Sequence, residues 1–352
     1  MINIAKDFIV IPVRENDYLI DGISKYLKKE PGIVKWNYFA DNTFNPELCS
    51  TIRKKDVYIL LTLDKYPSNC LEMCYDLIDA VRRARPESIT LVMPEHPGQR
   101  QDKRHNKREA ISVARHAKIF QVLGVHHAIS IDLHSPQIEG LYDSMDNMKG
   151  SYFFADYIKK NIGNVKNSII ISPDAGGMRS ATHLSRMFSP NMDIGFIQKE
   201  RIGTNKAKTG KVVGDVKGKD VILFDDIFDT GGTIFMAAEV CKKAGAKKIY
   251  ACVSHALCNN RKGFHNKNNF EKSIEEKMIE SCVDEFVFFN TRERITELLK
   301  EFPKLKKKVT VLNLANYLGE TIKRDFSGDT LDMFKQVNVE KLYSIEHKAG
   351  GV

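Results

Sequence analysis

Short apolar runs alternate with longer amphipathic stretches along most of the chain, and this alternation constrains the fold more than any other feature. The runs with the length and β-branched character of buried strands are Phe8–Val13, Val57–Leu63, Ile89–Met93, Ala128–Leu133, Ile169–Ser172, Ile194–Gln198, Val221–Phe224, Ile249–Ser254, Glu285–Phe289 and Val309–Leu312. Helical periodicity lies between many of them, at Cys70–Arg85, Arg108–Leu123, Arg179–Phe188 and Thr233–Ala244. Continuous apolar strands separated by helices are typical of parallel sheets covered on both faces. The sequence therefore predicts an α/β fold with right-handed crossovers.

The alternation runs through the chain twice, and 352 residues are too many for one ordinary domain. A polar, glycine-containing stretch, Asp146–Ser151, is a candidate joint near the middle. We therefore expect two domains, residues 1–150 and 151–308, each a mostly parallel sheet flanked by helices. Residues 309–324 are a candidate to return to the first domain. Residues 325–352 do not continue the alternation of apolar runs and amphipathic stretches, and we interpret them as a C-terminal appendage.

Composition excludes several classes of protein. No run of about 18 apolar residues is present, so no membrane span is expected. The first residues lack the pattern of a signal peptide, and seven cysteines without framework spacing favour free thiols, so a cytoplasmic location is expected. The net charge of +9 favours anionic partners, but it leaves nucleic acid, a membrane surface and phosphorylated small molecules open. The chain has one Trp and does not interleave aromatic with basic residues, which weighs against nucleic acid.

The most informative segment for chemistry is Val221–Thr233, which reads VILFDDIFDTGGT. Four apolar residues predict a buried strand, and Asp225 and Asp226 follow at its expected end. Asp229 then precedes Thr-Gly-Gly-Thr, a turn into a helix whose free backbone N–H groups suit a phosphate. Paired carboxylates can accept hydrogen bonds from the vicinal hydroxyls of a sugar. A plain strand-turn-helix corner with solvated acids is the alternative, and so many acids in so short a span weigh against it.

This segment resembles the phosphoribosyl-diphosphate-binding fingerprint of type I phosphoribosyltransferases. Further motifs resemble those of ribose-phosphate pyrophosphokinases, in the same order from about residue 8 to about residue 324. They are Arg100–Lys103 with Arg108–Ser112, Asp132–His134, Ser172–Gly177, Lys199–Arg201 and Val212–Lys219. The resemblance implies two tandem phosphoribosyltransferase-like domains. It assigns ATP to residues 1–150 and a 5-phosphorylated ribose to residues 151–308.

The resemblance also implies roles for particular residues. The ATP-binding residues would be Phe39, Asp41, Arg100, Gln101, Asp102 and His134. The ribose-phosphate-binding residues would be Asp225, Asp226, Asp229, Thr230, Gly231, Gly232 and Thr233. The basic run around Arg100 could also pass for a nucleic-acid or localisation patch, but its place just past a strand end favours the phosphates of a small molecule.

Two residues are candidate ligands of a divalent cation. His134 follows a predicted strand end beside Asp132, and Asp174 follows another. A lone histidine is more often a satisfied core residue, and Asp174 might only cap the turn at Gly176 and Gly177. An imidazole and a carboxylate with retained waters suit Mg²⁺ on a nucleotide better than a closed zinc site.

Lys199 and Arg201 leave a predicted strand and enter a loop bracketed by Gly203 and Gly210. Side chains at i and i+2 of an extended chain point to the same side. A closing basic loop supplies the charge that phosphoryl transfer needs around the transferred group, so the resemblance makes these two residues catalytic. An exposed basic loop with no role is the alternative.

The family's adenine-contacting loop has Phe, an acid two residues on, and Glu two further. This chain has Phe39 and Asp41, but Thr43 replaces the Glu, which puts strict adenine discrimination in doubt. In the family this loop reaches the active site of a neighbouring subunit, so the resemblance implies a homo-oligomer.

The resulting prediction is a Mg²⁺-dependent diphosphokinase that transfers the β,γ-diphosphoryl group of ATP to the anomeric 1-hydroxyl of ribose 5-phosphate and releases AMP. Residues 259–268 form a longer and more basic segment than the family's. This difference keeps open a larger acceptor, such as ADP-ribose. A non-catalytic regulatory paralogue is a further alternative, although such a protein has no reason to keep Lys199, Arg201, His134 and Asp174.

Overall fold

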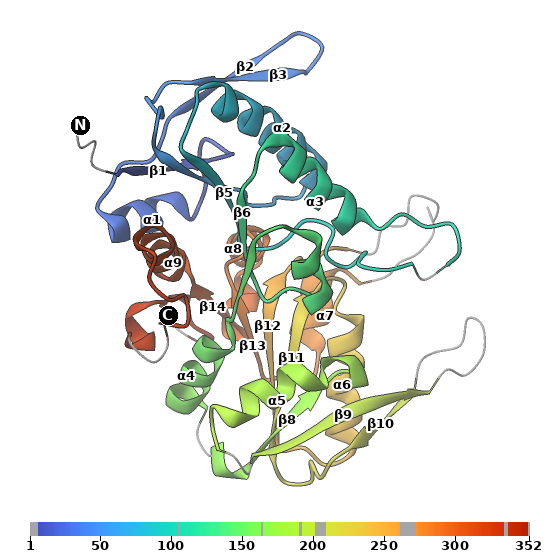
Figure 1. Ribbon diagram of the computed structural model, residues 1–352. Helices are drawn as coiled ribbons and strands as arrows, with labels where there is room; N and C mark the ends of the chain where they lie inside the picture. The colour runs from blue at the N-terminus through green and yellow to red at the C-terminus, as the bar shows by residue number, and fades with distance from the viewer. Residues whose placement is uncertain are drawn as a thin grey trace. The chain divides into compact units, whose positions relative to one another are not determined.

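The computed structural model describes two compact units. The described residues are 6–104, 106–162, 165–189, 192–200, 209–260, 272–333 and 337–350. Unit 1 is formed by residues 1–149, 291–293 and 314–342, and unit 2 by residues 150–290, 294–313 and 343–352. Figure 1 labels the helices and strands of both units. Each unit has its own sheet and its own hydrophobic core.

Unit 1 is built on a parallel sheet with the strand order β1-β4-β5-β6-β7. These strands are β1 (Phe8–Pro12), β4 (Asp56–Leu60), β5 (Ser88–Met93), β6 (His127–Ile131) and β7 (Met145–Met148). One face packs against α2 (Pro67–Arg83) and α3 (Ser112–Leu123), which contribute residues such as Cys74, Leu77 and Phe120 to the core. An antiparallel hairpin of β2 (Val34–Tyr38) and β3 (Phe44–Leu48) completes the N-terminal part.

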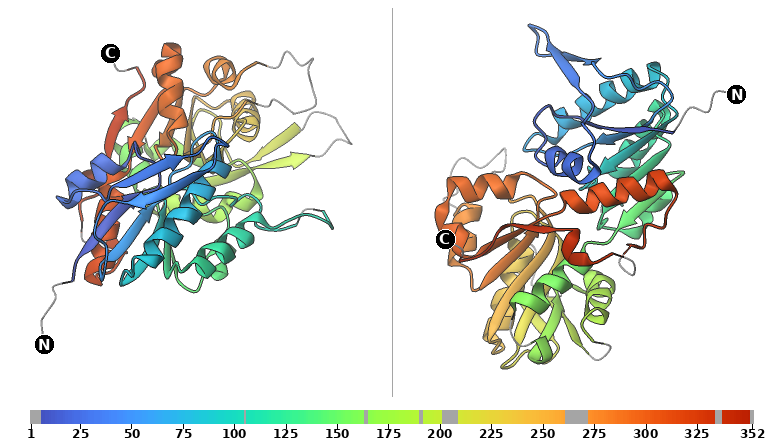
Figure 2. Two further views of the ribbon diagram at one scale, coloured as in Figure 1. Left: turned by 90° about the horizontal axis from the view of Figure 1, so that it is seen from above. Right: turned by 90° about the vertical axis from the view of Figure 1, so that its left-hand side faces the viewer.

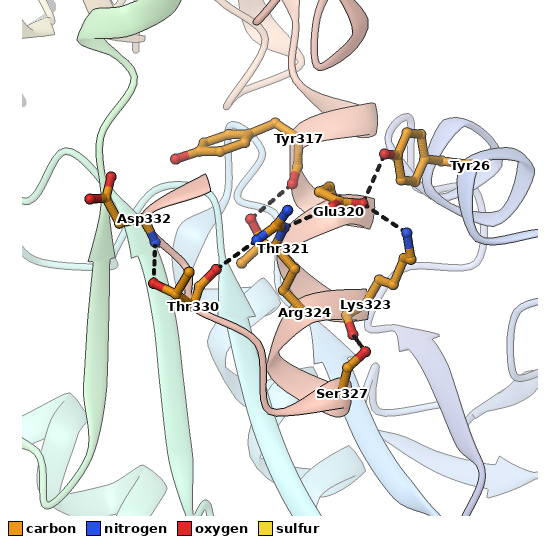
Figure 3. Close-up of polar contacts among 9 residues, drawn as sticks. All are labelled: Tyr26, Tyr317, Glu320, Thr321, Lys323, Arg324, Ser327, Thr330 and Asp332. Atoms are coloured by element: carbon orange, nitrogen blue, oxygen red, sulfur yellow. Dashed lines mark hydrogen bonds and ion pairs between the residues drawn. The ribbon is translucent and has the colours of Figure 1, made fainter. Parts of the chain in front are cut away.

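Two further helices of unit 1, α1 (Ile20–Leu27) and α9 (Ala315–Ser327), pack against each other, as Figure 2 also shows. The contact is close: a Cβ on Gly22 would lie 2.5 Å from the Cβ of Ala315. Buried Glu320 accepts hydrogen bonds from the Tyr26 hydroxyl (2.9 Å) and from Arg324 Nε (2.7 Å), as drawn in Figure 3. Burial alone would raise the pKa of Glu320, but these hydrogen bonds outweigh it and lower the pKa. Satisfied polar groups therefore fix how α9 docks in unit 1.

Unit 2 is built on a mixed sheet with the strand order β10-β9-β8-β11-β12-β13-β14-β15. The central strands are parallel, and β10 and β15 are antiparallel edges. The strands are β8 (Ser168–Ser172), β9 (Asp193–Glu200), β10 (Thr209–Val213), β11 (Asp220–Phe228), β12 (Lys248–Ala256), β13 (Glu285–Phe289), β14 (Val309–Asn313) and β15 (Ser344–His347).

Helices cover both faces of the second sheet. They are α4 (Ser151–Asn161), α5 (Met178–Arg186), α6 (Gly232–Lys243), α7 (Ile274–Glu280) and α8 (Arg294–Glu301). On one face, the core contains Ile234 of α6, Met278 of α7 and Leu298 of α8. On the other face, Phe154 of α4 stacks on Phe289 of β13 with ring centroids 4.0 Å apart. Two mostly parallel sheets flanked by helices confirm the predicted fold class.

Several element boundaries differ from those expected. Helix α3 begins at Ser112 and not at Arg108, because residues 106–110 are exposed and give the chain no apolar contact to fold against. The first half of the expected joint Asp146–Ser151 is part of strand β7, which pairs with β6, and the division between the units falls within the joint, between Lys149 and Gly150. Strand Val309–Asn313 pairs with β13 in unit 2, and the return to unit 1 begins at Leu314. Within residues 325–352, α9 continues to Ser327 and Ser344–His347 is an edge strand, so parts of this segment belong to the two units.

Candidate active site

Strand β11 extends past its neighbour β8, and this overhang presents the acidic residues of unit 2. The pairing of β11 with β8 ends at Leu223 and Ile171, whereas the pairing of β11 with β12 continues to Phe228 and Ala256. The sequence pattern predicts that Asp225 and Asp226 follow the end of this strand. In the structure they lie inside β11 instead. Strand β12 supplies backbone partners for these extra residues, which the sequence of β11 alone does not reveal.

Three carboxylates share one electrostatic environment at this overhang. Asp174 follows β8, and its charge acts on Asp225. Burial first, then the neighbouring Asp226 and then Asp174, raises the pKa of Asp225 well above its ordinary value. Crowded carboxylates of this kind suit a hard cation or the hydroxyls of a sugar, because either relieves their mutual repulsion.

Asp174 also has a local structural role. Its Oδ1 accepts hydrogen bonds from the backbone N–H groups of Gly176 (3.0 Å) and Gly177 (3.3 Å). The Ser172 hydroxyl donates to the Asp174 carbonyl at 2.6 Å and fixes the turn from the other side. The turn cap that the sequence offered as the alternative role of Asp174 is therefore present.

The Asp229–Thr233 segment forms the turn into α6. Gly231 is the N-cap with φ of +72°, and as a glycine it has no side chain to cap the helix. A Cβ on Gly231 would lie 2.3 Å from Phe235 Cε2 and 2.9 Å from Phe228 Cζ, so only glycine fits. At Gly232 a Cβ would meet only the Thr230 hydroxyl, at 4.0 Å. The first turn of α6 thus presents backbone N–H groups in a form that suits an anion.

The segment after β12 holds this turn in place. The backbone N–H groups of Leu257 and Cys258 donate to the Phe228 carbonyl at 2.8 and 3.1 Å. Asn259 donates through its side chain to Asp229 Oδ1 (2.9 Å) and through its backbone to the Asp229 carbonyl (3.2 Å). Asn259 is the first residue of the unusual 259–268 segment, of which residues 261–268 lie outside the described residues. Sequence reasoning assigned Asn259 no role, and no local pattern signals one.

In unit 1, the segment Asp132–His134 follows β6 in a constrained turn. Asp132 has φ of +43°, and its N–H donates to the Met148 carbonyl at 2.9 Å. The N–H of His134 donates to Oε1 of buried Gln99 at 3.0 Å, while the His134 side chain is exposed. His134 is therefore not a buried core histidine. Gln99, which sequence reasoning did not single out, supports the backbone that presents it.

The segment after β5 carries the predicted triphosphate contacts. Gly98 has φ of +72° and lies against α3, where its Cβ would be 3.3 Å from the Ser112 Cβ. Arg100 and Gln101 are exposed, and Asp102 is half-buried. The Gln101 N–H donates to the Gly98 carbonyl at 2.9 Å, and the Ser112 hydroxyl donates to the Gln101 side-chain oxygen. A compact turn thus projects Arg100 into solvent just past the carboxyl end of β5.

Phe39 and Asp41 lie at the tip of the β2–β3 hairpin. Phe39 is 56% exposed, unusually open for a large aromatic side chain. Asp41 accepts hydrogen bonds from the Thr43 hydroxyl (2.7 Å) and N–H (3.0 Å), which lower the pKa of Asp41. Thr43 stands where the resemblance expects Glu, and its side chain holds the hairpin tip through its hydrogen bond to Asp41.

The two predicted catalytic cations are only partly covered by the structure. Lys199 pairs through its backbone with Gly210 across the β9–β10 hairpin, but its side chain is not described. Arg201 and residues 202–208 lie outside the described residues. Among the described helices, none has the length and apolar character needed to cross a membrane.

Known proteins resemble the chain over most of its length. Residues 8–124 match the N-terminal domain of ribose phosphate pyrophosphokinase, and residues 142–295 match the phosphoribosyl transferase domain. A ribose-phosphate pyrophosphokinase of Campylobacter jejuni is 33% identical over 88% of this chain and 93% of its own. One of Aquifex aeolicus is 32% identical over 92% of this chain and 97% of its own.

A solved structure agrees with these sequence matches. The crystal structure of phosphoribosylpyrophosphate synthetase from Mycobacterium smegmatis superimposes with a TM-score of 0.81 and 28% sequence identity. The match covers 92% of this chain and 100% of that one. Both units therefore have counterparts in one protein of similar length.

Proposed function

Since the chain belongs to the ribose-phosphate pyrophosphokinase family, we propose that it transfers the β,γ-diphosphoryl group of ATP to the anomeric 1-hydroxyl of ribose 5-phosphate and releases AMP. The observation that carries this proposal is the carboxyl-terminal half of β11 in unit 2 and the turn after it. Acidic Asp225 and Asp226 lie in this half of the strand, and the glycine turn that opens α6 follows it. One element thus offers acceptors for sugar hydroxyls and donors for a phosphate.

In this mechanism unit 2 binds the acceptor sugar. The N–H groups of Gly232 and Thr233, at the start of α6, bind the 5-phosphate, and the hydroxyls of Thr230 and Thr233 add donors. Asp225 and Asp226 accept hydrogen bonds from the 2- and 3-hydroxyls of the ribose and so orient the 1-hydroxyl for in-line attack. Asn259 keeps Asp229 and its turn in place through the contacts described above.

Unit 1 binds ATP in the proposed mechanism. Exposed Arg100 contacts the triphosphate, Gln101 and Asp102 lie beside it, and Phe39 with Asp41 from a second copy of the chain contacts the adenine. The two predicted ligands fit Mg²⁺ by their chemistry, because a solvent-exposed imidazole and a carboxylate can each share the ion with water and phosphate oxygens. Bound Mg²⁺ would neutralise phosphate charge and polarise the phosphorus that is attacked. His134 and Asp174 would hold it.

Lys199 and Arg201 stabilise the transferred diphosphoryl group in this proposal. Phosphoryl transfer depends mainly on positioning and on charge stabilisation, so no covalent nucleophile is needed. The support is the β9–β10 hairpin, which places the backbone of Lys199 at the end of a long antiparallel ribbon.

The test is AMP release by the purified full chain with Mg²⁺ and ATP, measured separately with ribose 5-phosphate and with ADP-ribose. AMP released with ribose 5-phosphate supports the proposal. AMP released only with ADP-ribose supports the larger acceptor, which the contact between Asn259 and Asp229 favours because it joins the 259–268 segment to the sugar-phosphate turn. No AMP with either acceptor would point to a regulatory paralogue.

We also propose that the exposed hairpin tip completes the ATP site of a second copy of the chain. The 56% exposure of Phe39 supports this, because a large aromatic side chain normally finds a partner. A mixture of inactive Phe39→Ala and inactive Lys199→Ala chains should regain part of the activity, because some sites then combine two intact halves. A mixture that stays inactive while size exclusion shows mixed oligomers would contradict this arrangement.

A further inference from the structure

A second cluster of metal-ligating side chains lies in unit 1, apart from every residue assigned to the reaction. His127 begins β6, Asp146 lies in the adjacent β7, and Asp325 lies in the last turns of α9. One nitrogen or oxygen atom from each lies within 4.8 Å of the other two. From this geometry we propose that His127, Asp146 and Asp325 bind a divalent transition metal ion of the Zn²⁺ type.

The distances between the three side chains fit a shared ion. His127 Nε2 is 3.0 Å from Asp146 Oδ2 and 3.8 Å from Asp325 Oδ1. Two ligands of a tetrahedral zinc ion with bonds of about 2.0–2.1 Å are roughly 3.3 Å apart, so the observed separations lie on either side of that value. Three protein ligands leave a fourth position for water, and the partial exposure of all three side chains gives an ion access.

The imidazole nitrogen at the centre of the cluster is itself unsatisfied. His127 Nε2 is buried and has no hydrogen bond of good geometry to any described residue, although Asp146 Oδ2 is close. A buried nitrogen that faces two carboxylates at ion-pair distances, without good hydrogen-bond geometry to either, is an arrangement that an intervening cation would satisfy. Unlike His134 and Asp174, which would share Mg²⁺ with the phosphates of a nucleotide, this cluster would hold its ion with three protein ligands, one of them an imidazole. Such a set favours Zn²⁺, because Mg²⁺ without phosphate oxygens prefers oxygen ligands throughout.

Two further side chains orient the ligands, as outer partners do in metal sites. His127 Nδ1 is 2.7 Å from the Ser144 hydroxyl, so with the proton on Nδ1 the lone pair is on Nε2. The hydroxyl of buried Tyr58 donates to Asp325 Oδ2 at 2.7 Å and leaves Oδ1 toward the cluster. These contacts place ligand atoms from three separate chain segments before any ion arrives.

The location suggests what the ion would do. Asp325 belongs to the segment 314–342, which rejoins unit 1 after residues 150–290 and 294–313 of unit 2. An ion bound by Asp325, His127 and Asp146 together would link α9 to strands β6 and β7 of the sheet. Metal occupancy would then stabilise unit 1, whose state can be followed through Trp36, the single Trp of the chain, in β2.

The test is equilibrium dialysis of the full chain against Zn²⁺, with excess Mg²⁺ present to occupy oxygen-ligand sites. Wild type should bind one more Zn²⁺ per chain than Asp146→Asn or His127→Gln, and Zn²⁺ should raise the unfolding midpoint seen by Trp36 fluorescence only in wild type. Tyr58→Phe should weaken the affinity about tenfold to a hundredfold. Asp329→Asn, which removes an exposed acid just beyond α9, is the charge-matched control and should bind as wild type does.

Asp146→Asn is nearly isosteric, and circular dichroism confirms whether it folds. Folded Asp146→Asn that binds as many Zn²⁺ ions as wild type, with the same affinity, would overturn the proposal. So would a wild-type chain whose Trp36 midpoint does not respond to Zn²⁺, because the cluster would then be only an ion pair between a histidine and its carboxylates.

Discussion

Replacing Gly231 by Ala tests whether the turn into α6 is as tightly specified as the structure indicates. Gly231 has φ of +72°, and an added Cβ would lie 2.3 Å from Phe235 Cε2. Gly232→Ala is the matched control, since its Cβ would have no atom closer than the Thr230 hydroxyl at 4.0 Å. The two variants therefore make the same chemical change at adjacent positions with opposite steric consequences.

The expected loss of stability follows from three contributions. The left-handed backbone costs Ala about 1–2 kcal/mol. Overpacking against Phe235 and Phe228 costs roughly another 1–3 kcal/mol. The smaller freedom of Ala in the unfolded chain returns about 0.4–1 kcal/mol. Gly231→Ala should therefore lower the free energy of unfolding of unit 2 by about 1–5 kcal/mol, whereas Gly232→Ala, at the first residue of a helix, should change it little.

The assay must report on unit 2. Trp36, the single Trp of the chain, lies in unit 1, so its fluorescence is the wrong probe. Hydrogen exchange of α6 residues 232–243 by mass spectrometry, together with urea unfolding followed by circular dichroism, measures the relevant unit. Gly231→Ala should also raise the KM for ribose 5-phosphate more than the KM for ATP. If both variants match wild type within about 0.5 kcal/mol, the steric reasoning about this turn is wrong.

Three other predictions concern charge. Lys199→Ala should lower the rate of AMP release by roughly 10²–10³-fold, as the loss of a transition-state contact does, and leave ATP binding nearly intact; unchanged turnover would remove Lys199 from the mechanism. In unit 1, Arg292 and Glu95 form a buried two-bond ion pair, so Glu95→Gln should cost about 3–5 kcal/mol of unfolding free energy in Trp36-monitored urea unfolding, and a cost below 1 kcal/mol would contradict this role. Burial lowers the pKa of His96 from 6.5 to about 4, and His96 Nε2 shares a hydrogen bond with the Tyr142 hydroxyl. The stability that neutral His96 contributes to the folded state is therefore complete above pH 6.5 and is lost as the pH falls toward 4. Between pH 7 and pH 5 this loss amounts to about 2 kcal/mol, which should be absent from His96→Gln; equal pH dependence in both chains would refute it.

The local chemistry of the two binding regions was largely readable from the sequence. The run VILFDDIFDTGGT predicted a strand, paired acids and a glycine turn into a helix, and the structure contains all three. The parallel α/β class was readable as well, because strand and helix periodicities depend on neighbouring residues. The position of Asp225 and Asp226 inside β11 was not readable, since it depends on how far β12 continues beside them.

Contacts between distant segments were beyond any local pattern. Gln99 supports the backbone of His134 across 35 residues, and Asn259 holds Asp229 across 30. Neither residue differs in kind from many other polar residues of the chain. Only the packing of strand ends against neighbouring segments distinguishes them.

The amino-acid order by itself determined which segments become strands, which become helices, and where glycine, acid and base stand at their ends. These properties follow from side-chain spacing and from backbone freedom over a few residues. Tertiary structure alone decided which of those ends meet. It brought Asp325 of α9 back beside His127 and Asp146, because α9 buries its apolar face in unit 1 after the chain has built the sheet of unit 2 as far as β14. Burial of apolar surface is non-directional and acts between segments at any separation, so the partners it selects are not written in any one stretch of sequence.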